Sequence, residues 1–145
     1  MGNNMLFNLQ RLALSVVVAL LLAGLIPAVS AQDPDSERGR ISRNGHFRII
    51  VESLVQPIMI NKIHTWELKL ESADGLPVSG AEITLLGGMP EHNHGLATKP
   101  RVTRSGDDGN YLVEGIRFHM RGYWELKFTV KTASEQDTVL FPLEL

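Results

Sequence analysis

The chain of 145 residues contains no cysteine. Without a thiol it can form no disulfide framework, no cysteine nucleophile and no thiolate-ligated zinc, iron–sulfur or blue-copper centre. A strong charge imbalance is also lacking, because the formal net charge is only −2. We therefore expect no nucleic-acid partner. The GxSxG and HExxH patterns of hydrolases and zinc proteases are absent as well, and nothing in the composition predicts an enzyme.

One long apolar run is present, near the N-terminus. Arg11 ends a short polar stretch, residues 12–26 are predominantly apolar, and small residues follow at 29–31. This layout is typical of a secretory signal peptide. The run is shorter than the about 20 residues that a membrane span needs. We expect a cleaved signal over residues 1–31, no stable membrane span afterwards, and a periplasmic or secreted protein; an uncleaved N-terminal anchor is the rival interpretation.

Two regions follow the expected signal peptide. Residues 32–45 are polar and hold too little apolar surface to offset the entropy of ordering them, which predicts a flexible lead-in. Residues 46–145 alternate short strand-like stretches with turn signals and show no helical periodicity. The expected strands are 47–54, 64–71, 81–86, 101–104, 111–120, 123–131 and 137–143. The prediction is an all-β fold, an immunoglobulin-like antiparallel β-sandwich of about seven strands.

Alternation of apolar and polar residues assigns the inward faces. Two similar segments, TWELKL and YWELKF, each place a tryptophan on the inward face. In the expected strand 111–120 the same rule turns Phe118 and Met120 inward. It turns His119 outward, toward solvent.

The stretch Met89 to Gly95, MPEHNHG, holds one thioether and two imidazoles. These are ligand types for a soft or borderline metal ion. In extended backbone, residues two apart point to the same side with a rise of about 3.3 Å per residue. His92 and His94 could therefore both turn toward one ion, with Met89 close by. The alternative is an ordinary surface loop that contains two histidines.

Two further residues are candidate ligands if the loops after residues 86 and 120 lie at the same end of the sandwich. Met120 would then approach the MPEHNHG loop, although a core role is its alternative. His64 begins a strand and could approach from the same rim, or could cap that strand by hydrogen bonding. A mixture of methionine and histidine suits copper, because thioethers favour Cu(I) whereas imidazole serves both Cu(I) and Cu(II).

The order of four segments, PIMINKIHTWEL, DGLPVSGAEITL, MPEHNHG and GIRFHMRGYWELKF, resembles the FixH and YtkA-like group of small exported or membrane-tethered β-sandwich proteins. The resemblance covers residues 57–130, and MPEHNHG followed by FHMRGYW is its most specific part. It implies a role in copper handling, in cytochrome oxidase supply or in resistance, with Met89, His92, His94 and Met120 as ligands. FixH-type members commonly keep a transmembrane anchor, which is not evident here.

Three functions compete at this point. The first is a periplasmic copper-binding protein, a chaperone or buffer that exchanges the ion with a donor or acceptor protein. The alternative is a metal-free immunoglobulin-like interaction module that binds a protein or sugar through its rim loops. A copper oxidase or monooxygenase is the third, and it is disfavoured because a histidine brace needs histidine as the first mature residue, where we expect Gln32.

Overall fold

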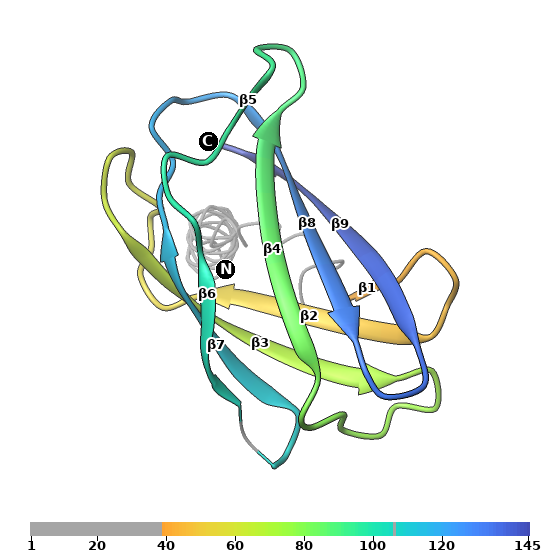
Figure 1. The fold of residues 1–145 in the computed structure, drawn as a ribbon. Helices are drawn as coiled ribbons and strands as arrows, with labels where there is room; N and C mark the ends of the chain where they lie inside the picture. The colour runs from red at the N-terminus through yellow and green to blue at the C-terminus, as the bar shows by residue number, and fades with distance from the viewer. Residues whose placement is uncertain (1–38, 106) are drawn as a thin grey trace, which may run out of the picture. The chain divides into compact units, whose positions relative to one another are not determined.

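The computed structural model describes residues 39–105 and 107–145, which fold into two antiparallel β-sheets (Figure 1). The sheet orders are β1-β2-β3-β7-β6 and β5-β4-β8-β9. The bounds are β1 Arg40–Ile41, β2 Phe47–Ser53, β3 His64–Ser72, β4 Glu82–Met89, β5 His94–Gly95, β6 Arg101–Ser105, β7 Asn110–Ile116, β8 Tyr123–Lys131 and β9 Gln136–Glu144. The predicted all-β antiparallel sandwich is confirmed. The seven expected strands are present, and two further strands of two residues each, β1 and β5, lie at sheet edges. Within the described ranges no helix is long and apolar enough to cross a membrane.

The predicted alternation builds the core between the sheets. TWELKL lies in β3 of the five-stranded sheet and YWELKF lies in β8 of the four-stranded sheet, so each sheet contributes one inward tryptophan. Trp66 and Trp124 are both buried, and the residues at alternate positions after them are buried too. Burying such a continuous apolar face is what stabilises a domain that has no disulfide.

Phe118 joins the two tryptophans at one end of the core. Its ring centre lies 6.2 Å from that of Trp66 and 5.2 Å from that of Trp124, the second contact being T-shaped. Phe118 is fully buried but lies beyond the end of β7, in the connection to β8. A buried aromatic side chain therefore anchors this connection to the core.

The predicted strand 111–120 is wrong beyond Ile116, where β7 ends. Gly115 is an extra residue in the ladder, because His64 pairs with Ile116 whereas Thr65 pairs with Glu114. Its φ of +85° fits a β-bulge, which turns the strand at its end. Phe118 is nevertheless fully buried, as its inward assignment predicts, whereas Met120 is 38% exposed and the outward assignment of His119 is wrong.

The expected flexible lead-in, 32–45, differs from the structure in its last part. Arg40 pairs with Ile49 and Ile41 with Arg48 as β1 adds to the sheet edge, and Ser42 is buried. Backbone pairing and polar contacts, rather than apolar burial, order this part. Residues 32–38 and the expected signal peptide 1–31 lie outside the described residues.

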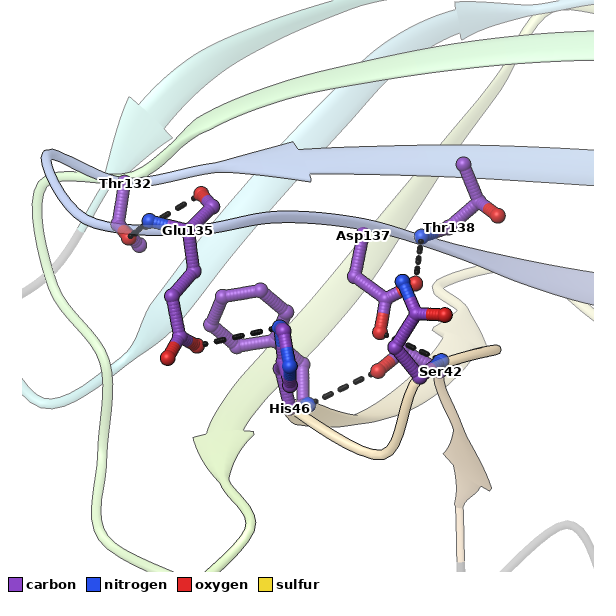
Figure 2. Close-up of polar contacts among 8 residues, drawn as sticks. Ser42, His46, Thr132, Glu135, Asp137 and Thr138 are labelled. Carbon is purple, nitrogen blue, oxygen red and sulfur yellow. Dashed lines mark hydrogen bonds and ion pairs between the residues drawn. The ribbon is translucent and has the colours of Figure 1, made fainter.

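A buried carboxylate holds the β1–β2 turn against β9 (Figure 2). Asp137 accepts hydrogen bonds from the backbone N–H of Asn44 at 2.9 Å and of Thr138 at 2.8 Å. The backbone N–H of Arg43 also donates to the Thr138 carbonyl at 2.8 Å. Figure 2 shows His46 beside this cluster, 3.3 Å from the Glu135 carboxylate. The turn that begins the sandwich is thus fixed to its last strand.

Gly109 closes the turn before β7 with a φ of +76°, and its carbonyl accepts a hydrogen bond from the Leu70 N–H at 2.8 Å. A Cβ at this position would lie 2.6 Å from the Leu70 carbonyl oxygen and 3.1 Å from the Val78 nitrogen. We expect Gly109→Ala to lower the free energy of unfolding by at least about 2 kcal/mol, because a left-handed residue with a Cβ costs about 1–2 kcal/mol before any clash. Urea denaturation followed by circular dichroism measures it.

The matched control is Gly75→Ala. Gly75 has a similar φ of +79° but a Cβ there would meet nothing within 4 Å. It should therefore show only the conformational cost, about 1–2 kcal/mol, without the steric cost expected at Gly109. Equal losses in the two variants would contradict the steric explanation for Gly109.

Candidate functional site

The MPEHNHG stretch is a hairpin at one end of the sandwich. β4 ends at Met89 and β5 begins at His94, with Met89 and His94 directly opposite each other. The backbone N–H groups of His92 and Asn93 donate to the Met89 carbonyl at 3.1 and 3.0 Å, and Asn93 has a φ of +52°. Figure 1 shows that this hairpin, the connection from β7 to β8 and the C-terminus lie at the same end. The sequence left open whether these loops meet, and the His94 and His119 rings, whose centres are 4.7 Å apart, show that they do.

His94 turns toward the end of the core. Residues directly opposite in an antiparallel pair project from the same face, and its partner Met89 is buried. The His94 ring centre lies 6.3 Å from that of Trp124, and the ring is partly buried. The hairpin thus brings one predicted ligand onto the buried indole.

His119 is the residue that sequence reasoning missed. We expected it to face solvent, but its ring centre lies 4.7 Å from that of His94 and 5.5 Å from that of Trp124. The reason is that residue 119 follows the buried Phe118 in a connection rather than in a strand, so alternation does not apply. The FHMRGYW motif contained the signal, because His119 stands in it beside Met120 and Trp124.

His92 completes a row of rings. It is exposed, and its ring stacks on His94 with a centre-to-centre distance of 5.7 Å and an interplanar angle of 17°. The row therefore runs from solvent to the core in the order His92, His94, His119 and Trp124. Two of the five predicted ligands belong to it.

The other three predicted ligands are placed differently. Met89 is a core residue whose methyl group lies near Gly122, since a Cβ on that glycine would be 3.1 Å away from it. Met120 is 38% exposed, and its carbonyl accepts a hydrogen bond from the Trp124 indole at 3.2 Å. His64 is buried beside Phe118, and its Nε2 lies 2.8 Å from the Met59 carbonyl oxygen. The strand-capping alternative thus describes the observed contact of His64.

The ring spacings suit metal coordination. A nitrogen–metal bond of about 2.0 Å puts each imidazole centre about 3 Å from the ion, so two rings that share an ion lie about 4.5 to 6 Å apart. The distances of 4.7 Å and 5.7 Å along the row fall in this range. Among the residues that the structure describes, no three His, Cys, Asp or Glu side chains are grouped so as to hold an ion. The row therefore provides nitrogen ligands in pairs.

The sequence model of one known protein family matches a region of the chain that includes the whole candidate site. The sequence model of the YtkA-like family matches residues 42–129, which is more than half of the chain and includes every residue of the ring row. No curated protein and no solved structure matches the chain. By the extent of the family match, the chain belongs to the YtkA-like family.

Proposed function

We propose that the protein binds copper after export to the periplasm and acts as a chaperone or buffer. The observation that carries the proposal is the adjacency of the two hairpin histidines, His92 and His94, at the solvent end of a row of rings. Neutral imidazoles are good ligands for copper, and an exposed first ligand allows the ion to be taken from, or passed to, a partner protein. The proposal assigns binding and transfer, not catalysis.

The test is copper binding by the purified protein beside a variant with both His92→Ala and His94→Ala. We expect stoichiometric Cu(I) or Cu(II) binding by the parent protein and its loss in the double variant. The matched control is His46→Ala, which removes an imidazole that contacts Glu135 away from the row. This control should bind copper like the parent protein. Absence of copper binding in the parent protein would refute the proposal.

A second candidate, a metal-free interaction module, has one supporting observation. The connection from β2 to β3 exposes several large apolar side chains, namely Leu54, Val55, Met59 and Ile63. Contiguous exposed apolar side chains are common at protein contacts. If the parent protein binds no copper, this connection becomes the first surface to examine for a protein partner.

A further inference from the structure

We infer that His94 and His119 form a two-nitrogen site for a soft monovalent ion, Cu(I), and that the Trp124 indole closes its inner side. The inference rests on the proposed function and deepens it, because it names the ion, the oxidation state and a ligand outside the hairpin. Three observations carry it: the approach of the two rings, the burial of their nitrogens and the position of the indole.

The first two observations are the approach of the two rings and the burial of their unpaired nitrogens. The Nδ1 atoms of His94 and His119 are both buried, and neither has a hydrogen-bond partner among the described residues. Leaving a buried polar atom without a hydrogen bond destabilises the fold. Two such atoms on rings whose centres are 4.7 Å apart are an arrangement that an ion held by both nitrogens would satisfy.

The number of ligands favours Cu(I). Zinc takes four ligands in structural protein sites, and Cu(II) favours tetragonal sets of nitrogen and oxygen ligands. Cu(I) is a closed-shell ion that sets no rigid geometry and forms stable complexes with only two ligands, and ring centres 4.7 Å apart would hold it in a bent arrangement. Within the described parts of the chain, no third His, Cys, Asp or Glu side chain is grouped with the two rings. Of the three ions compared, only Cu(I) is satisfied by two imidazole ligands.

The surroundings also favour a single positive charge. The inner side of the pair is Trp124, which is fully buried and lies 5.5 Å from His119 and 6.3 Å from His94, centre to centre. Removing an ion from water costs more for a double charge than for a single one. The indole can recover part of this cost through a cation–π contact, which acts within about 6 Å of a ring centre.

The indole is held in place for this role. Its Nε1–H donates to the Met120 carbonyl at 3.2 Å, and Phe118 packs against it in a T-shaped contact. Both partners flank His119 in the chain, so the same connection fixes the indole and presents the second imidazole. His92 stacks on the outer side of His94 and is exposed, which assigns it to ion entry rather than retention.

The experiment compares His119→Ala and His92→Ala by anaerobic Cu(I) competition against a chromophoric chelator. We expect His119→Ala to weaken Cu(I) binding at least about 100-fold, beyond the 10–100-fold cost of losing an indirect partner of a metal site. His92→Ala should stay within about tenfold of the parent protein. His119→Met, which restores a soft ligand, should recover Cu(I) binding and serves as the folding control, supported by circular dichroism.

A second readout follows the indole. The chain has two tryptophans, so a Trp66→Phe background leaves Trp124 as the only indole emitter. Stoichiometric Cu(I), or Ag(I) as its redox-inert analogue, should change this emission, whereas Zn²⁺ should bind no better to the parent protein than to His119→Ala. Cu(I) binding that survives in His119→Ala and is lost in His92→Ala would overturn the inference while leaving the copper proposal standing. No Cu(I) or Cu(II) binding in the parent protein would refute both.

Discussion

Replacing Trp124 by Ala is expected to lower the free energy of unfolding by about 3–5 kcal/mol. The side chain is fully buried and packs on Phe118, and its Nε1–H is the hydrogen-bond partner of the Met120 carbonyl. The substitution therefore opens a cavity at the end of the core and removes a hydrogen bond. Since a domain has a total stability of about 5–15 kcal/mol, the loss should be plain in urea denaturation followed by circular dichroism.

Trp66 offers a matched comparison in the opposite sheet. It is also buried, but its Nε1 is a buried atom that has no hydrogen-bond partner among the described residues. Trp66→Phe removes ring volume and also removes an unpaired N–H whose burial costs about 1–3 kcal/mol. We expect it to cost less than about 1 kcal/mol and Trp124→Phe to cost about 2 kcal/mol, because only the second leaves a carbonyl without its donor. The reverse ranking would contradict this account of the two tryptophans.

The fold could be predicted from the sequence because alternation is a local signal. In β8 the pattern of YWELKF places Trp124, Leu126 and Phe128 inward, and all three are fully buried. A strand that faces the core on one side and solvent on the other must alternate in this way. Turn residues then mark the ends of the strands, so the bounds of β8 match the prediction residue for residue.

The ring row could be predicted only in part. His92 and His94 are two residues apart in sequence, and the turn over residues 90–93, in which Asn93 has a φ of +52°, brings their rings together. His119 comes from another connection, and alternation carried past Ile116 gives it the wrong direction. The decisive features are the bulge at Gly115 and the burial of Phe118, and both depend on how the two sheets close rather than on any local pattern.

The thioether ligands illustrate the same limit. Met89 and Met120 are close to the histidines in sequence, yet Met89 belongs to the core and Met120 contacts Trp124 through its backbone carbonyl. A methionine side chain is apolar and flexible, so its sequence position alone does not separate a ligand from a core residue. Whether Met89 or Met120 is a ligand therefore depends on the fold as well as on the sequence.

The second large effect concerns Asp137, which should stabilise the fold near neutral pH and lose that contribution in acid. Burial by itself would raise the pKa of this carboxyl group, but hydrogen bonds to the ionised form outweigh burial and hold its pKa below the ordinary value. The donors are the Ser42 hydroxyl and the backbone N–H groups of Thr138, Asn44 and His46. Since hydrogen bonds to a charged group contribute about 1.5–3 kcal/mol each, we expect Asp137→Asn to cost about 3 kcal/mol at pH 7.

The pH dependence of that cost is the sharper test. A carboxyl group whose pKa is lower in the folded state stabilises the fold at every pH above its unfolded-state pKa of about 3.9. The contribution is lost as the pH falls from that value through the lower folded-state pKa, because protonation then favours the unfolded chain. The difference in unfolding free energy between the parent protein and Asp137→Asn should therefore be largest at pH 7 and shrink below about pH 3.9.

Urea denaturation at pH 7 and at successively lower pH values measures this difference. Asp74→Asn is the control, because Asp74 is exposed in a turn and its replacement should leave stability nearly unchanged at every pH. If the gap between Asp137→Asn and the parent protein were the same in acid as at neutrality, the charge of Asp137 would not be what holds the β1–β2 turn. Because the turn begins the sandwich and β9 ends it, a shrinking gap would show that one ionised side chain links the two sheets at the edge where β1 and β9 lie.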